Sequence, residues 1–582
     1  MTRLEVWAPR ARRGVEVDLG GGERLLRMIS DPDTGWYHAE IDDLGPGGDY
    51  AFVLDGRGPF PDPRSPWQPD GVHGSSRLLD HDAFEWSDHD WPGADPRDGI
   101  IYELHVGTFS PSGDFDGVVD RLDHLVSLGV STVELMPVCE FSGRRNWGYD
   151  ATCLYAPHHA YGGPDGLKRL VDACHRRGLA VVLDVVYNHL GPEGNYLGHY
   201  GPYFTDFYST PWGEAVNFDR ADSDEVRRFV IDNALMWLRD YHLDGLRLDA
   251  VHAIIDTSAV HVLEQMAIEV DQLGVELGRP LTLVAESDQN DPRLCSPRDR
   301  GGYGLHAQWS DDFHHALHVA LTGEHGGYYR DFGGLGPLAK ALERGWVFTG
   351  DYSAFRRRRH GRDPDGLSGR HLLGYAQNHD QVGNRAVGDR LALLVGDGRQ
   401  RIAAALVLTS PFVPLLFQGE EWGSESPFLY FTDHQDRELG RAVAQGRRSE
   451  FGEFGWEPDE VPDPQDPATF QRSCLDWSEP DRPRHAAMLE WYRSLVDLRS
   501  REPALAVGEL ACAVAYGDDD SWLRVDRGGF VVVVNLAADP QAVPCPAGRV
   551  VLASHDDVAD EAGAGGLPLP AESVAIVTTL SS

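Results

Sequence analysis

Short apolar segments alternate with longer amphipathic segments through the middle of the chain, and this alternation limits its possible folds more than any other feature. The amphipathic segments, such as residues 116–130 and 224–243, repeat apolar side chains at the spacing of an α-helix. The apolar segments are rich in Val, Leu and Ile and are typical of buried strands. Because strands that alternate with helices are joined by helical crossovers, the pattern predicts a parallel sheet.

Seven apolar segments are clear strands, and residues 303–312 supply an eighth. The seven are residues 99–109, 131–138, 179–189, 244–252, 280–288, 372–380 and 412–421. Eight strand–helix repeats over about four hundred residues match a closed (β/α)8 TIM barrel with inserted loops. An open doubly wound sheet is the alternative, but the chain has no glycine-rich phosphate loop of the dinucleotide or Walker type. The sequence therefore predicts the α/β class with a (β/α)8 barrel at its centre.

Both ends of the chain consist of short segments in which polar and apolar residues alternate between turn residues. LEVWAP at 4–9 and SWLRVDR at 521–527 are examples. This pattern is typical of strands in antiparallel β-domains. We therefore expect an N-terminal β-sandwich at residues 1–92, the catalytic barrel at 93–506 and a C-terminal β-sandwich at 507–582.

The charge balance argues against two classes of partner. Lys and Arg number 52 against 92 Asp and Glu, a net charge of −40, and so acidic a surface repels phosphate backbones and anionic membranes. We expect no nucleic acid and no membrane partner, since no apolar run is long enough to span a bilayer either. The first residues lack a signal-peptide pattern, and the seven scattered cysteines, without a CxxC pair, are typical of reduced thiols. These features predict a cytoplasmic protein.

The strand segment GLRLDAVHAI at 245–254 carries two charged residues among apolar ones. Strand side chains alternate between faces, so Arg247 and Asp249 share one face. Burial of an unpaired carboxylate is costly, and a buried Asp is therefore paired or functional. On this segment alone a structural Arg–Asp ion pair stays open.

Polar residues follow the apolar run at four of the predicted strand ends. They are Asp184, Asn188, His189, Arg247, Asp249, Glu286, Asn378, His379 and Asp380. The C-terminal ends of barrel strands are where such folds carry their chemistry. A set of acids with Arg and His suits a reaction that builds positive charge at carbon. Cleavage of a glycosidic bond is such a reaction, because it needs a proton donor and a nucleophile or base around an oxocarbenium-like centre.

In order and spacing, these four segments resemble the motifs of the α-amylase clan of retaining glycoside hydrolases and transglycosylases, and the resemblance covers the whole chain. It implies that Asp249 is the nucleophile, Glu286 the general acid/base and Asp380 the residue that stabilises the distorted sugar. Arg247 would hold Asp249 ionised, since a neighbouring cation favours the carboxylate.

The resemblance also implies four supporting residues. His189 and His379 would hydrogen-bond sugar hydroxyls around the reacting ring, and Tyr149, in NWGYD, would stack on that ring. Asp184 would support the site from beneath. A core role for Tyr149 and a structural role for Asp184 remain alternatives.

Three further stretches, 143–197, 308–318 and 430–456, are similar to the trehalose-releasing members of the clan. This similarity implies hydrolysis of the α-1,4 bond next to the terminal trehalose of maltooligosyl trehalose, other α-1,4-glucans as further substrates, and a pathway shared with a maltooligosyltrehalose synthase. Residues 430–456 are polar, aromatic and beyond the last strand, so we expect a loop over the barrel mouth. Candidate sugar contacts, each with a structural alternative, are Trp309, Asp311, Asp312, His314, Phe431 and His434.

Two other functions remain open at this stage. A glycogen branching enzyme shares the leading β-domain and the same three acids but transfers the glucan to a sugar hydroxyl. A non-catalytic glucan-binding scaffold could use the same barrel, although it has no need of Glu286. The motifs call for no redox cofactor and no oxygen cage for calcium is recognisable, so we expect no cofactor and no metal.

Overall fold

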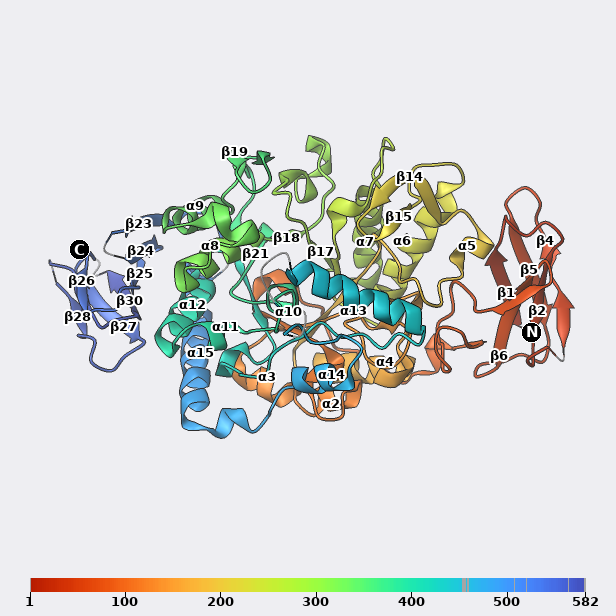
Figure 1. Cartoon of the computed structure of the whole chain (residues 1–582), viewed down its shortest axis with the longest axis horizontal. Helices are drawn as coiled ribbons and strands as arrows, with labels where there is room; N and C mark the ends of the chain where they lie inside the picture. Colours follow the sequence, from red (N-terminus) through yellow and green to blue (C-terminus); the bar gives the residue numbers. More distant parts are fainter. Residues whose placement is uncertain are drawn as a thin grey trace.

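The computed structural model describes residues 2–579 except positions 23, 453–456, 458–459, 507, 520 and 564. At its centre, eight parallel strands close into a barrel (Figure 1). In order around the barrel they are β9 (Ile101–Leu104), β10 (Thr132–Leu135), β13 (Ala180–Val185), β16 (Gly245–Leu248), β17 (Thr282–Ala285), β18 (Ala307–Trp309), β21 (Leu372–Tyr375) and β22 (Val413–Phe417). The seven apolar segments and residues 303–312 contribute one strand each, which confirms the predicted (β/α)8 class.

The barrel strands are buried on both faces, which explains why their sequences are continuously apolar. Every residue of β9, β10, β13, β16 and β17 is buried, because helices cover the outside of a barrel and side chains fill its interior. The longer helices of the barrel part are α4 (Gly163–His175), α6 (Ser223–Asp240), α7 (Val262–Leu277), α8 (Asp311–Thr322), α12 (Asp397–Thr409) and α15 (Pro483–Arg501).

Four successive barrel strands each carry one buried charged residue: Glu103, Glu134, Asp184 and Arg247. Glu103 lies opposite Glu134 in the ladder between β9 and β10, and Asp184 lies opposite Arg247 between β13 and β16. A charged side chain in a core is costly unless it is paired or protonated. These residues therefore mark a polar layer of the barrel below the mouth.

Two β-rich parts lie at opposite ends of the long axis, with the barrel between them (Figure 1). The N-terminal part contains β1 (Thr2–Trp7), β2 (Val15–Asp18), β3 (Leu25–Arg27), β4 (Ile29–Ser30), β5 (Trp36–Ile41), β6 (Asp49–Leu54), β7 (Arg57–Phe60) and β8 (Ser76–Arg77). The C-terminal part contains β23 (Ala513–Gly517), β24 (Trp522–Arg527), β25 (Phe530–Asn535), β26 (Gln541–Val543), β27 (Gly548–Ala553), β28 (Glu561–Ala562), β29 (Leu567–Leu569) and β30 (Ser573–Thr579).

The β-rich ends agree with the predicted fold class, while the domain boundaries after residues 92 and 506 stay predictions. Within the described residues, no helix combines the length and the apolar character that crossing a bilayer requires.

The segment 430–456 differs from its prediction, because most of it is a helix, α13 (Arg437–Gly452), rather than a loop. The residues of α13 include many strong helix formers, and the Asp436 carboxylate accepts the N–H groups of Glu438 and Leu439 as an N-terminal cap. Positions 453–456 lie outside the described residues. Arg447 of α13 donates to the carbonyl of Gly383, which places α13 against the short helix α10 (His379–Gly383) that carries Asp380.

Candidate active site

Arg247 and Asp249 lie together where β16 opens into the barrel mouth. The fully buried Arg247 donates from Nη1 to Asp249 Oδ1 at 2.7 Å, and Asn188 Nδ2 donates to Asp249 Oδ2 at 2.7 Å. Burial alone would raise the pKa of Asp249, but the Arg247 cation and the Asn188 amide outweigh it and lower that pKa. Asp249 is therefore an ionised carboxylate, the form that can act as a nucleophile.

Glu286 follows β17 and approaches the same guanidinium from the other side. Its Oε2 accepts the N–H of Ala250 at 2.6 Å and lies 3.7 Å from Arg247 Nη2. Burial raises the pKa of Glu286 well above the ordinary range, and Arg247 opposes this rise only in part. A carboxylic acid that keeps its proton at neutral pH can donate it. Two neighbouring carboxyls with opposite pKa shifts form an acid and nucleophile pair.

Asp380 is the most open of the three acids, with 38% of its side chain exposed. It lies in the first turn of α10 (His379–Gly383), where Asn384 Nδ2 donates to its Oδ1 at 3.1 Å. His379 Nε2 lies 3.6 Å from the same oxygen. Much of the carboxylate therefore remains available to a ligand in the barrel mouth.

Asp184 and Tyr149 lie beside the acids. Arg247 Nη1 donates to both oxygens of Asp184 at 2.9 Å, and the Tyr149 hydroxyl donates to Asp184 Oδ2 at 2.6 Å. Burial raises the pKa of Asp184 to about 6 against the opposing effect of Arg247. The Tyr149 ring stacks on His379, with ring centroids 5.2 Å apart. Stacking of Tyr149 on a sugar stays a prediction.

His189 contacts protein oxygens with both of its ring nitrogens. Its Nδ1 lies against Asn188 Oδ1, and its Nε2 lies 3.0 Å from the carbonyl oxygen of Tyr149. A hydrogen bond from His189 to a sugar hydroxyl would compete with these contacts. Its ring also stacks on Trp212, whose side chain is half exposed on the hairpin between β14 (Phe204–Thr210) and β15 (Gly213–Val216).

Comparison with known proteins connects this geometry to a family. Residues 79–211 match the alpha amylase catalytic domain, and residues 508–576 match a domain of unknown function, DUF3459. The chain is 52% identical to the malto-oligosyltrehalose trehalohydrolase of Arthrobacter ramosus over 99% of both chains. It is 44% identical to that of Saccharolobus solfataricus, with 91% of this chain and 90% of the relative covered.

The chain belongs to the malto-oligosyltrehalose trehalohydrolase family. It is thus a glycoside hydrolase with an alpha-amylase catalytic domain, and its relatives imply α-1,4-glucan substrates. A crystal structure from Salmonella typhimurium, described as an alpha amylase, shares 38% identity and superposes with a TM-score of 0.90 over 99% of this chain and 97% of that one. A glycogen branching enzyme from Mesorhizobium japonicum is 32% identical over only 53% of this chain and 48% of its own length.

In this trehalohydrolase family member, two predicted sugar contacts lie in the apolar interior. Trp309 is 2% exposed and its ring packs beneath Arg247, with the guanidinium carbon 4.4 Å from the ring centre. Phe431 is fully buried in a cluster with Trp147 and Phe428. Sugar contact by either side chain stays a prediction, and this burial argues against it.

Asp312 and His314 are held by contacts within the protein. Asp312 Oδ2 accepts the N–H groups of Val347 and Phe348 at 2.8 and 2.9 Å, so it ties that loop to the start of α8. His314 is 2% exposed and stacks on Tyr375 with ring centroids 5.6 Å apart. Their contacts with sugar stay predictions, and these protein contacts would compete with a ligand.

His434 is 7% exposed, and its Nδ1 lies 3.4 Å from Glu193 Oε2. It borders a cavity of about 660 Å³ that is also lined by Arg437, Arg441 and Gln465. None of the three acids lines this cavity. Contact between His434 and a sugar stays a prediction.

Asp311 stays with the catalytic acids. The Tyr375 hydroxyl donates to Asp311 Oδ1, and burial raises the pKa of Asp311 to about 7. Its negative charge is one cause of the raised pKa of Glu286. Asp311 therefore acts on Glu286 electrostatically, whether or not it also touches a sugar.

We expect Asp311→Asn to move the alkaline limb of the pH profile of kcat/KM to lower pH. Without this negative charge the pKa of Glu286 falls, so Glu286 loses its proton, and the enzyme its activity, at a lower pH. The pH dependence of kcat/KM for the two enzymes measures the shift. Asp312→Asn is the matched control. The Asp312 carboxylate holds the loop at Val347 and is not a cause of the raised pKa of Glu286, so this variant should leave the alkaline limb in place. A uniform loss of activity across pH in Asp311→Asn would contradict the electrostatic role.

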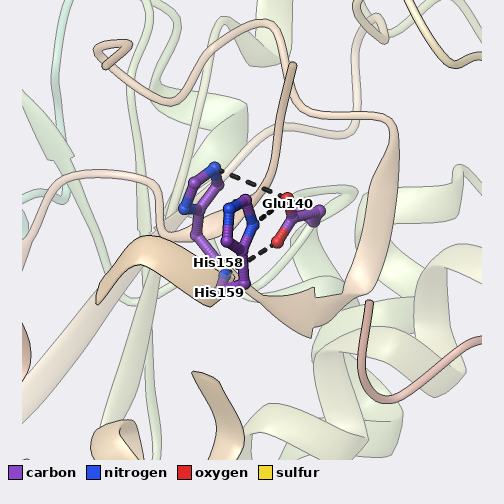
Figure 2. A group of neighbouring side chains, drawn as sticks. All are labelled: Glu140, His158 and His159. Carbon is purple, nitrogen blue, oxygen red and sulfur yellow. Dashed lines mark hydrogen bonds and ion pairs between the residues drawn. The ribbon is translucent and has the colours of Figure 1, made fainter. Parts of the chain in front are cut away.

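One group of described residues has the composition of a metal site: Glu140, His158 and His159 (Figure 2). Glu140 Oε1 lies 2.7 Å from His159 Nδ1 and 3.5 Å from His158 Nε2. His158 Nδ1 accepts the N–H of Ala160, so the neutral ring carries its proton on Nε2, the atom that would have to bind a metal. Glu140 Oε2 also accepts the His159 N–H at 2.8 Å. Glu140 at the end of β11 (Cys139–Glu140) thus contacts His159, two residues after β12 (Cys153–Pro157), with both carboxylate oxygens. His158 Nε2 has no hydrogen-bond partner among the described residues.

Sequence reasoning missed several residues of the site. Glu103 contacts His379 and Tyr375 donates to Asp311, and neither was singled out, whereas Asn188, which donates to Asp249, was named at its strand end without a role. Glu103 could have been found, because it is a charged residue inside an apolar strand, as Arg247 is. Tyr375 gives no such signal, since an aromatic residue in a strand is ordinary core.

Proposed function

We propose that this protein hydrolyses the α-1,4-glucosidic bond next to the terminal trehalose of maltooligosyl trehalose. The products are trehalose and a shortened maltooligosaccharide. The observation that carries the proposal is one guanidinium, that of Arg247, which contacts both Asp249 and Glu286. The pKa of Asp249 is lowered there and that of Glu286 is raised, and the chain's relatives bear this activity in their names.

The proposed route is a double displacement. Asp249 attacks the anomeric carbon while Glu286 gives its proton to the departing oxygen of trehalose, which leaves a maltooligosyl ester on Asp249. Glu286, now ionised, takes a proton from water, and the resulting hydroxide equivalent cleaves the ester from the opposite side. Asp380, open to the mouth, would bind the hydroxyls of the reacting ring in its oxocarbenium-like state.

We predict retention of configuration, because two successive inversions restore the α-anomer. Proton NMR of the first minutes of hydrolysis should show the new reducing end of the maltooligosaccharide as α, before mutarotation. Initial formation of the β-anomer would contradict the route through Asp249. The nucleophile and acid/base carboxyls should then lie about 5–5.5 Å apart in a substrate complex.

The alternatives are separated by incubating the enzyme with maltooligosyl trehalose and, separately, with amylose. Release of trehalose supports the proposal. A falling iodine stain with new α-1,6 branch points would identify a branching enzyme, and binding without product would identify a scaffold. The short match to the branching enzyme, about half of each chain, favours the hydrolase.

A supplier of this substrate must convert the terminal α-1,4 linkage of a maltooligosaccharide into the trehalose linkage, so we propose that a maltooligosyltrehalose synthase acts in the same pathway. We also propose that the enzyme works in the cytoplasm, where its seven free cysteines would stay reduced. Amylose incubated with both enzymes should yield trehalose, and neither enzyme alone should release it.

A further inference from the structure

Both carboxylate oxygens of Glu103 contact the same residue of the site, His379. Glu103 is buried on β9, where its Oε2 accepts the backbone N–H of His379 at 2.9 Å and its Oε1 lies 2.5 Å from His379 Nδ1. A carboxylate accepts hydrogen bonds and donates none. His379 Nδ1 therefore carries a proton.

The other ring nitrogen of His379, Nε2, is protonated as well, because its neighbour Tyr149 has only one hydroxyl proton to donate. The single hydroxyl proton of Tyr149 goes to Asp184 Oδ2 at 2.6 Å, because Asp184 already accepts from Arg247 and acts as a carboxylate. The Tyr149 oxygen lies 2.7 Å from His379 Nε2 and has no second proton to give, so Nε2 must donate. With N–H donors at both nitrogens, His379 is an imidazolium.

The charges around His379 agree with this count. Burial lowers the pKa of His379, but Glu103 and Asp380 outweigh burial and raise that pKa to about 9, against the opposing charge of Arg247. The charged and titratable groups that face His379 are Glu103 from β9, Glu134 from β10, Asp184 from β13, Arg247 from β16, Tyr149 and His105 from loops, and Asp380 from α10.

We propose that Glu103 is a positioning residue for the reaction, which keeps His379 doubly protonated so that His379 can hold Tyr149 and Asp380. The imidazolium donates to the Tyr149 hydroxyl, stacks against its ring at 5.2 Å, and lies 3.6 Å from Asp380 Oδ1. A neutral ring with its proton on Nδ1 would face the Tyr149 oxygen with a lone pair and lose the attraction to Asp380. The proposal deepens the proposed function and rests on it for its kinetic consequences.

Glu134 provides a matched control. It lies opposite Glu103 in the strand ladder and is equally buried, yet neither of its oxygens has a hydrogen-bond partner in the part of the chain that the structure describes. Burial raises its pKa well above the ordinary range, so Glu134 is a neutral acid. Glu134→Gln therefore replaces one neutral, equally sized group by another, whereas Glu103→Gln removes a charge.

The test compares full-length wild-type enzyme, Glu103→Gln and Glu134→Gln. In NMR spectra with ¹⁵N-labelled histidine, the His379 signal is assigned by its absence in His379→Asn. We expect His379 to stay doubly protonated from pH 5 to 8 in wild type and in Glu134→Gln. In Glu103→Gln it should titrate within or below that range, because burial then lowers its pKa without opposition from Glu103.

The kinetic expectation follows from the lower pKa of His379 that we expect in Glu103→Gln. In Glu103→Gln, kcat/KM at pH 7 should fall by about 10- to 100-fold, and part of the loss should be recovered at lower pH, where the weakened imidazolium is protonated again. Glu134→Gln should stay within about threefold of wild type. Glu103→Asp, which keeps the charge, should restore part of the rate.

Two results would overturn the proposal. One is a neutral His379 at pH 7 in the wild-type enzyme, a measurement that uses no substrate and is therefore separable from failure of the proposed function. The other is an equal loss of kcat/KM at every pH in Glu103→Gln with His379 still doubly protonated, which would make Glu103 merely structural. If Glu103→Gln does not fold, the wild-type spectrum and the activity of Glu103→Asp still test the role proposed for Glu103.

Discussion

Asp249→Ala lowers kcat for maltooligosyl trehalose by about 10⁴- to 10⁶-fold, the size of loss seen when a covalent nucleophile is removed. Without the carboxylate no glycosyl ester can form, and the rest of the site provides no substitute, since Glu286 keeps its proton. Initial rates at saturating substrate measure the loss. This is the largest effect that the structure leads us to expect.

The fold should survive this substitution. Arg247 keeps its two contacts with Asp184 at 2.9 Å, so its charge is not left unpaired when Asp249 is removed. We expect the free energy of unfolding to fall by about 1–3 kcal/mol, the cost of one unsatisfied buried donor, as measured by urea denaturation.

Asp249→Asn separates the nucleophile from a structural ion pair. The amide keeps the shape of Asp249 and can still accept from Arg247, but it cannot attack carbon. If Asp249 is the nucleophile, Asp249→Asn should be as inactive as Asp249→Ala. If Asp249→Asn kept more than about a tenth of the activity, or if Asp249→Ala failed to fold, the structural ion pair would be the better explanation.

The barrel could be predicted because its signals are local. Strands such as β13 and β16 are buried on both faces and are therefore apolar throughout, and the helices between them show their period in the sequence. Strand alternation predicted that Arg247 and Asp249 share a face, and the resemblance implied that they pair. Their proximity to Glu286 followed from the rule that barrel strands end at one mouth.

The residues beyond the strands were harder to predict. Asp311 and Asp312 are adjacent at the start of α8, yet Asp311 lies beside the acids and Asp312 holds the loop at Val347. Successive helical residues point about 100° apart, and packing sets the rotation of the helix. The burial of Trp309 and Phe431 was hard to predict for a related reason, because an aromatic side chain next to polar residues can face either the cleft or the core.

Glu286→Gln lowers kcat for maltooligosyl trehalose by about 10²- to 10⁴-fold, the contribution of a well-placed general acid. The departing trehalose oxygen is a poor leaving group without a proton, and the amide has none of sufficient acidity to give. The amide oxygen can still accept the Ala250 N–H that Oε2 accepts at 2.6 Å, so the shape of the site should persist. In wild type, activity should fall as the pH rises through the pKa of Glu286, and this alkaline limb should be absent in the variant.

The substrate dependence of the loss identifies proton donation as its cause. Fluoride leaves without protonation, so α-maltosyl fluoride should still transfer its maltosyl group to Asp249 in Glu286→Gln. The ester then accumulates, because Glu286 is also the base that activates water, and a stoichiometric burst of fluoride should precede slow turnover. Asp249→Ala should show no burst. Equal losses of rate for the fluoride and for maltooligosyl trehalose would mean that Glu286 binds the sugar and does not protonate the leaving group.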